Sequence, residues 1–166
     1  MLNDCKYGYD TVENVMSLSL LRSPTWPYPD ADKGEHSFVY SIYPHSGDCR
    51  AGKVAIEAYK LNNPMIATEI GKQDGTLSAH YSFVSVDKDN VFVEAVKKAE
   101  DSGESVIRLY ENDGSATHAK LTFGFDVKSV YLSDMMENKI RELNVANNSV
   151  EVDFGAFEIV TLSVER

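Results

Sequence analysis

The second half of the chain consists of short apolar segments separated by turn-forming residues. In the clearest segment, residues 118–125, apolar side chains at every second position alternate with lysine and threonine. Such alternation places one face of a strand against a core and the other toward water. Further strands are expected over residues 83–86, 91–96, 105–110, 127–132, 150–154 and 157–164. Short strands with turn signals between them are typical of a small antiparallel β-sandwich.

A cluster of prolines dominates the first half. Pro24, Pro27 and Pro29 fall within six residues, and each fixes φ and lacks an N–H, so this segment is neither helix nor central strand. The strand expected next, residues 36–43, is apolar on both faces, which is typical of a strand between two packed sheets. The sequence therefore predicts a long, rigid loop held by core strands, and such loops often shape binding sites.

Only one helix is expected. Val54, Ala58 and Leu61 share one helical face within residues 52–61, and the Asn-Asn-Pro sequence that follows ends the helix. A strand is expected at 15–21, and the polar segment 71–80, with its two glycines, is a candidate linker. The front part thus has too few strands to cover its apolar faces, and we expect it to be a fragment of a larger β-domain.

The net charge of −10 and the isoelectric point near 4.8 exclude several functions. Binding to nucleic acid or to an anionic membrane needs clustered lysine and arginine, so neither is expected. No apolar run approaches the ~20 residues that cross a bilayer, and the N-terminus does not resemble a secretion signal. Cys5 and Cys49 are too few for a disulfide framework, which predicts a cytoplasmic protein with free thiols.

The sequence contains no recognisable catalytic or metal-binding motif. His36 and His45 precede Asp48 and Cys49, but the spacing fits no compact zinc pattern, and the acidic turn at 30–35 completes no calcium loop. There is no G-x-S-x-G motif, and no particular pair of carboxylates is singled out for glycoside hydrolysis. We therefore assign no catalytic residue and no metal ligand to this chain, and expect the histidines to hydrogen-bond the proline-rich loop.

Five ordered segments carry a family resemblance: NDCKYGYD (3–10), LLRSPTWPYPDADKGEH with YSIYPHSGD (20–48), EAYKLNNPM (57–65), the segment from FVSVDKDN to RLYEN (83–112), and FGAFEIVTLSVER (154–166). Together they resemble the C-terminal part of α-mannosidases of glycoside hydrolase family thirty-eight, in its bacterial and cytosolic branch. The resemblance covers nearly the whole chain. It implies an all-β fold, with an incomplete β-supersandwich portion at 1–72, a small terminal β-sandwich domain at 73–166, and one short helix.

The resemblance also implies a function. The full-length enzyme would hydrolyse terminal α-mannosides with retention, and its nucleophile and zinc ligands would lie on an N-terminal catalytic domain outside this chain. This chain would then be scaffold and cleft edge, without a cofactor of its own and inactive alone. Its expected partners are that catalytic domain and the mannoside substrate, and a homo-oligomer is also compatible with the sequence.

Four residues are candidates for substrate contact. By the resemblance, Asp4, Lys6 and Arg22 match positions that face the sugar cleft. An alternative for Arg22 is an ion pair with Asp30 or Asp32 that ties down the proline-rich loop, and we favour this alternative.

The fourth candidate is Trp26, whose ring could stack on a sugar, although a hydrophobic plug under the loop is the more common role of such a ring. A stand-alone carbohydrate-binding module or an oligomerisation module is the alternative function. It ranks lower because most aromatic residues fall on inward positions of the expected strands.

Overall fold

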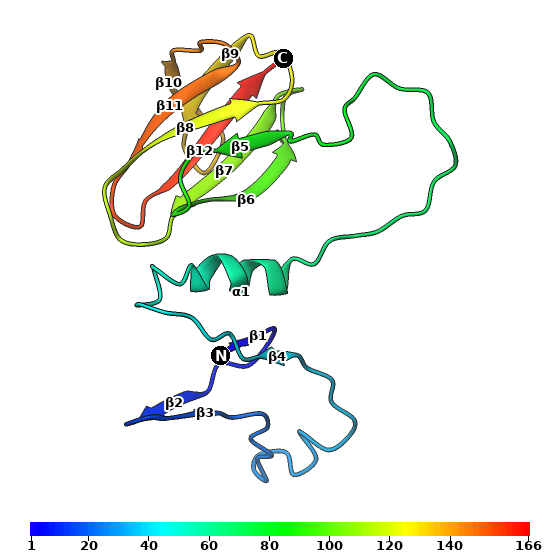
Figure 1. Ribbon diagram of the computed structural model, residues 1–166, viewed down its shortest axis with the longest axis vertical. Helices are drawn as coiled ribbons and strands as arrows, with labels where there is room; N and C mark the ends of the chain where they lie inside the picture. The colour runs from blue at the N-terminus through cyan, green and yellow to red at the C-terminus, as the bar shows by residue number, and fades with distance from the viewer. The chain divides into compact units, whose positions relative to one another are not determined.

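The computed structural model describes residues 1–166 and divides them into two units, Met1–Thr68 and Glu69–Arg166, hereafter unit 1 and unit 2 (Figure 1). The division falls four residues before the expected domain boundary at 72/73. Residues 69–80 contain no helix or strand.

Unit 2 contains eight strands in two antiparallel sheets (Figure 1). They are β5 (Val84–Val86), β6 (Val91–Lys98), β7 (Ser105–Glu111), β8 (Thr117–Phe123), β9 (Ser129–Ser133), β10 (Lys139–Leu143), β11 (Ser149–Phe154) and β12 (Ile159–Glu165). The first sheet has the order β10-β9-β12-β7-β6 and the second the order β11-β8-β5. The edge strands β10 and β11 belong to different sheets.

Alternating apolar residues of both sheets form one core. Ile107 on β7 and Leu162 on β12 meet Leu121 on β8 and Val150 on β11, and all four are at most 1% exposed. On β8 the intervening lysine and threonine face outward, as the alternation predicted. The predicted antiparallel sandwich is therefore confirmed for unit 2.

Two features of unit 2 differ from the expectation. Strand β10 was not predicted, because four of its five residues are exposed and show no alternation. The last strand begins at Ile159 rather than at residue 157. Phe157 has a left-handed φ of 57° and is 68% exposed, because its N–H turns to bind the Glu111 carboxylate at 3.0 Å.

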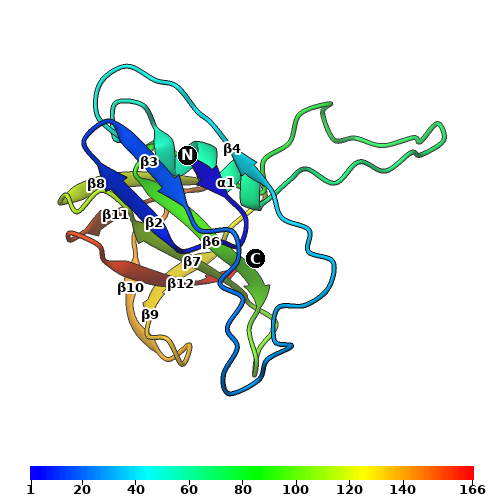
Figure 2. The same ribbon diagram turned by 90° about the horizontal axis from the view of Figure 1, so that it is seen from below.

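Unit 1 has much less regular structure. Strands β1 (Leu2–Asn3) and β4 (Tyr40–Ser41) form one two-stranded sheet, and β2 (Tyr9–Val12) and β3 (Val15–Leu18) form another. Figures 1 and 2 both show β2 and β3 side by side as a hairpin. The helix α1 (Val54–Asn62) confirms the predicted helix to within two residues at either end. As the only helix, it is too short and not apolar enough to cross a membrane.

The prediction of a buried strand at 36–43, apolar on both faces, is wrong. Only Tyr40 and Ser41 are in a strand, and Val39, Tyr40 and Ile42 are 51%, 55% and 76% exposed. The physical reason is the shortness of the partner strand β1, which pairs with only two residues. Leu2 is the single buried apolar residue of unit 1, and α1 buries none of its side chains completely.

Candidate functional site

Asp4, the first of the four candidate residues, closes the end of the β1–β4 pair. Its Oδ1 accepts a hydrogen bond from the Val39 N–H at 3.0 Å, and its own N–H donates to the Val39 carbonyl at 3.2 Å. The Val39 N–H, and secondly the Cys5 thiol, lower the pKa of Asp4. The bond with Asp4 raises the pKa of Cys5, which keeps that exposed thiol protonated.

Lys6 lies beside the same segment. Its ammonium is 4.7 Å from the centre of the Phe38 ring, within the range of a cation–π contact. Its backbone N–H binds the Asn3 side chain. The structure therefore places Asp4 and Lys6 together, next to residues 38 and 39, where each has a partner within unit 1.

Arg22 makes no ion pair, so the favoured alternative for this residue is wrong. Asp30 pairs instead with Lys33, three residues away. Asp32 accepts a hydrogen bond from the Ser23 N–H at 2.8 Å. The proline-rich loop is thus tied across its base by Ser23 and Asp32, and the Arg22 guanidinium remains exposed.

Trp26 is also exposed, at 84%, on a loop in which the Trp26–Pro27 peptide bond is cis. The interpretation of Trp26 as a plug beneath the loop is therefore wrong for this chain. Neither Trp26 nor Arg22 forms a hydrogen bond, ion pair or ring contact with Asp4 or Lys6. The four candidates form one neighbouring pair, Asp4 with Lys6, and two separately exposed side chains.

The two histidines singled out in the sequence lie in different surroundings. His36 Nε2 is 3.0 Å from the carbonyl oxygen of Asp32, so its predicted bond to the proline-rich loop is confirmed. His45 instead stacks on Tyr43, with ring centres 5.6 Å apart. No group of three or more histidine, cysteine, aspartate or glutamate side chains is arranged to hold a metal ion.

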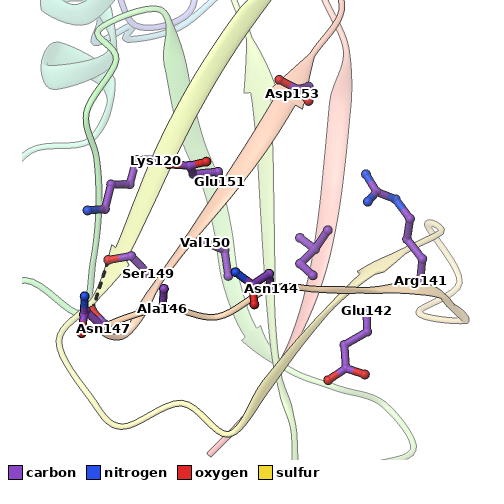
Figure 3. A pocket seen from close by; sticks show the side chains of 11 residues that line it. Lys120, Arg141, Glu142, Asn144, Ala146, Asn147, Ser149, Val150, Glu151 and Asp153 are labelled. Carbon is purple, nitrogen blue, oxygen red and sulfur yellow. Dashed lines mark hydrogen bonds between the residues drawn. The ribbon is translucent and has the colours of Figure 1, made fainter.

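Unit 2 contains a polar groove that sequence reasoning missed (Figure 3). It has a volume of about 600 Å³ and lies between the edge strands β10 and β11. It is lined by Lys120, Arg141, Glu142, Leu143, Asn144, Ala146, Asn147, Ser149, Val150, Glu151 and Asp153. In the sequence these polar residues look like the solvent-facing positions of strands and a turn, and no motif distinguishes them.

A tight turn shapes one end of this groove. Asn147 and Asn148 both have positive φ, at 51° and 54°, which asparagine tolerates better than most residues. Ala146 and Ser149 exchange two backbone hydrogen bonds, at 2.9 and 3.0 Å, as in a two-residue hairpin. The Ser149 hydroxyl also donates to the Asn147 carbonyl at 3.3 Å (Figure 3).

His118 and two neighbouring carboxylates lie beside the groove, on the outer face of β8 and β11. His118 Nδ1 is 2.7 Å from Asp153 Oδ1, and Nε2 is 3.5 Å from Glu151 Oε2. The bond to Asp153, followed by the charges of Asp153 and Glu151, raises the pKa of His118. His118 thus contacts two carboxylates, those of Glu151 and Asp153, that also line the groove.

Glu111 is the one buried carboxylate of unit 2, at 1% exposure. Burial raises its pKa, but hydrogen bonds from the N–H of Phe157, the Asn90 amide and the N–H groups of Asp113 and Ser115 outweigh burial and hold the pKa at about 2. The donor distances are 2.8–3.1 Å. With both oxygens occupied by donors, Glu111 joins two turns and is unsuited to donating a proton.

Most of unit 2 matches a known class of domain. Residues 90–162, from β6 through most of β12, match the family model described as the glycosyl hydrolases family 38 C-terminal beta sandwich domain. Residues 90–162 are therefore similar to the C-terminal beta sandwich domain of glycosyl hydrolases of family 38.

Individual relatives extend this similarity to unit 1. The chain is 38% identical, over 97% of its length, to alpha-mannosidase G of Dictyostelium discoideum. It is 35% identical over 98% of its length to alpha-mannosidase 2C1 of Homo sapiens, and 32% identical over 97% to alpha-mannosidase of Saccharomyces cerevisiae. It spans only 15%, 16% and 17% of the lengths of these three proteins.

Proposed function

We propose that this chain serves as the C-terminal β-domain region of an α-mannosidase that removes terminal α-mannose from mannosides. The observation that carries this proposal is the similarity to proteins named α-mannosidases, which covers 97–98% of the chain. It includes unit 1, which lies outside the matched family model.

In this proposal another part of the enzyme performs the chemistry. The nucleophile, the general acid and a zinc ion belong to a catalytic domain on the same polypeptide, in the bacterial and cytosolic branch of the family. The chain described here contributes scaffold and the edge of the sugar cleft. Two free, exposed thiols, Cys5 and Cys49, are compatible with the reducing cytoplasm.

The apolar surface of unit 1 supports a catalytic domain as partner. Large apolar side chains that are at least half exposed include Tyr7, Val12, Val15, Met16, Trp26, Tyr28, Val39, Tyr40 and Ile42. Soluble proteins rarely leave so many apolar groups uncovered unless another surface binds there. We propose that the catalytic domain covers part of this surface in the complete enzyme.

Among the four candidate contacts, Arg22 and Trp26 are the better supported. Both are exposed and neither is engaged elsewhere in unit 1. A guanidinium provides a planar set of donors for sugar hydroxyls, and an indole ring can stack on a sugar face. Asp4 and Lys6 already bind neighbours, so we propose that they position the cleft edge.

A chimaeric enzyme tests the proposal. The homologous segment of Dictyostelium alpha-mannosidase G would be replaced by this chain, and hydrolysis of 4-nitrophenyl α-mannoside compared with that of a deletion lacking the segment. We expect the chimaera to be active and the deletion inactive. Replacement of Arg22 by Ala in the chimaera should raise KM, whereas replacement of the exposed Lys98 should not.

A soluble but inactive chimaera, with the parent enzyme active under the same conditions, would contradict the proposal. The isolated chain should show no hydrolysis. Hydrolysis by the isolated chain that survives a second purification step would show that catalytic groups lie within these 166 residues.

The alternative function, a stand-alone carbohydrate-binding or oligomerisation module, gains one observation from the structure. Trp26 and Tyr28, which such a module could use, are 84% and 61% exposed. Sugar titration followed by Trp26 fluorescence distinguishes binding from self-association, and sedimentation of the chain alone measures the latter. Tight self-association without an effect of sugar would favour an oligomerisation module.

A further inference from the structure

We propose that the groove between β10 and β11 binds the hydroxyl groups of a neutral oligosaccharide. This inference rests on the proposed function only for the choice of a mannose-containing probe. The groove itself is defined entirely by residues of unit 2.

Five polar side chains around the groove are unpaired, whereas Glu151 and Asp153 contact His118 and the Ser149 hydroxyl donates to the Asn147 carbonyl. No hydrogen bond or ion pair within the chain involves the side chains of Lys120, Arg141, Glu142, Asn144 or Asn147. These five residues nevertheless include both positive and negative charges. Figure 3 shows Arg141 and Glu142 extending from β10 on one side of the groove, while Lys120 comes from β8 on the other. A set of donors and acceptors is therefore available to a ligand.

Some charged side chains elsewhere in unit 2 do have partners. Lys97 binds both Glu100 and Glu137 at 2.7 Å, and Lys139 pairs with Glu104. At the groove, Glu151 lies near His118, with 3.5 Å between Glu151 Oε2 and His118 Nε2. Lys120 and Glu151 are directly opposite in the β8–β11 register, yet they form no ion pair.

The backbone beneath these groups is rigid. Leu143 and Val150, which lie in the groove lining, also belong to the core, with exposures of 7% and 1%. The Asn148 side chain accepts a hydrogen bond from the Val127 N–H at 3.3 Å. This bond holds the turn against the loop between β8 and β9. A prearranged site loses little conformational entropy when a ligand binds.

The balance of charge indicates the class of ligand. Two cations, Lys120 and Arg141, line the groove together with two asparagine amides and three carboxylates, those of Glu142, Glu151 and Asp153. The last two carboxylates also contact His118. A phosphate or a nucleic acid would meet too many carboxylates, and a cationic peptide would meet lysine and arginine. Sugar hydroxyls both donate and accept, so they match all of these groups. A volume of about 600 Å³ suits a short oligosaccharide.

A solvated strand edge is the simplest alternative. Arg141 lies opposite Leu132 on the core-facing side of β10, and inward-pointing charges on edge strands prevent unwanted pairing. That role explains one arginine, but not the amides and carboxylates on the facing strand and turn. The two explanations differ in whether the groove binds a sugar.

An NMR titration of the full 166-residue chain tests the proposal. The probe is an α-linked mannotriose, and amide shifts are followed in 15N–1H spectra. We expect saturable shifts of Asn144, Asn147 and Glu151. Asn147→Gly removes the amide and keeps the positive φ that glycine accepts, so the turn should persist. Combined with Lys120→Gln, it should weaken binding about tenfold or more, as expected for the loss of two hydrogen bonds.

Lys98→Gln, on the exposed face of β6, is the matched control and should bind like the original chain. Absence of saturable shifts, or shifts confined to Trp26, would overturn the proposal, as would equal binding by the double variant. Stronger binding of mannose 6-phosphate than of mannotriose would overturn the neutral class of ligand. An active chimaera without groove binding would reject only this inference, and groove binding with an inactive chimaera would reject only the proposed function.

Discussion

Unit 1 and unit 2 are both rich in apolar residues, yet they bury them very differently. In unit 2, Ile107 and Leu109 on β7 are fully buried between two sheets. In unit 1, the apolar residues Val39 and Ile42 flank β4 and are more than half exposed. The contrast shows that burial depends on the strands beside a segment and on the layer above it, and not on the apolar character of the segment itself.

One strand in each unit illustrates this difference in burial. Strand β12 lies between β9 and β7, so both of its edges are paired. Strand β4 pairs with β1 over two residues and has no other neighbour in its sheet. A strand with one short partner holds its backbone in place but cannot shield its side chains. The following predictions test this comparison, beginning with the largest effect.

Truncation of an apolar side chain to alanine should lower the free energy of unfolding strongly in the core of unit 2. The same change should be nearly neutral at an exposed position of unit 1. Leu162→Ala leaves a cavity at a fully buried site, and we expect the free energy of unfolding to fall by about 2–5 kcal/mol. Val39→Ala should change it by less than about 0.5 kcal/mol. Urea unfolding followed by far-UV circular dichroism measures both. Similar losses for the two variants would refute the contrast.

Glu111→Gln tests whether a polar group also stabilises unit 2. The pKa of this carboxyl falls from 4.5 when unfolded to about 2 when folded, so its contribution is present above pH 4.5 and is lost as the pH falls toward 2. The shift corresponds to about 3 kcal/mol at most.

The variant should therefore be less stable than the original chain at pH 7, and the difference should shrink as the pH falls toward 2. Urea unfolding at several pH values measures it. Asp101→Asn, in the exposed turn after β6, serves as the control. A difference between Glu111→Gln and the original chain that stays constant with pH would contradict the assigned pKa.

Gly114→Ala should have a moderate effect. Gly114 has φ +69°, and an added Cβ would lie 2.5 Å from the end of the Phe157 ring. The exposed ring can move aside, so the left-handed backbone sets the cost, which we expect to be about 1 kcal/mol. Gly103→Ala, where nothing lies within 4 Å, is the control. Thermal unfolding should show a lower Tm for the first variant only.

His118 should give the smallest effect, because it is exposed. Its pKa is raised, so the stabilisation from its bond to Asp153 is present below the ordinary histidine pKa of 6.5 and is lost as the pH rises through the folded value. Proton NMR should show a titration midpoint above 6.5. Asp153→Asn, which removes the 2.7 Å contact, should lower the midpoint more than Glu151→Gln, which removes the 3.5 Å contact. The reverse order would contradict this geometry.

The parts of the fold that were predictable depend on local patterns. Strand β8 alternates strictly, and helix α1 repeats at helical spacing before an Asn-Asn-Pro stop. Strand β10 was missed because an exposed edge strand needs no apolar alternation. Residues 36–43 were expected to be buried because their composition suits a core, but composition does not supply the covering layer.

The candidate sites show the same limit. Arg22 was singled out by the family resemblance, and Trp26 because it is the only tryptophan and lies in the proline-rich loop. The exposure of both became clear only in the structure. The polar groove could not be found at all. Its residues come from β8, β10 and β11, and their separation in the sequence carries no signal until the two edge strands are placed.

The sequence alone determined the all-β character of unit 2 and the inward face of β8, because periodicity acts over a few residues. It also carried the resemblance to α-mannosidases. Only the tertiary structure decided that β12 lies between β9 and β7, that Glu111 gathers donors from Asn90 and Phe157, and that unit 1 leaves its apolar side chains exposed. These outcomes depend on which distant strands pair and pack, and that choice follows from the free energy of the whole domain.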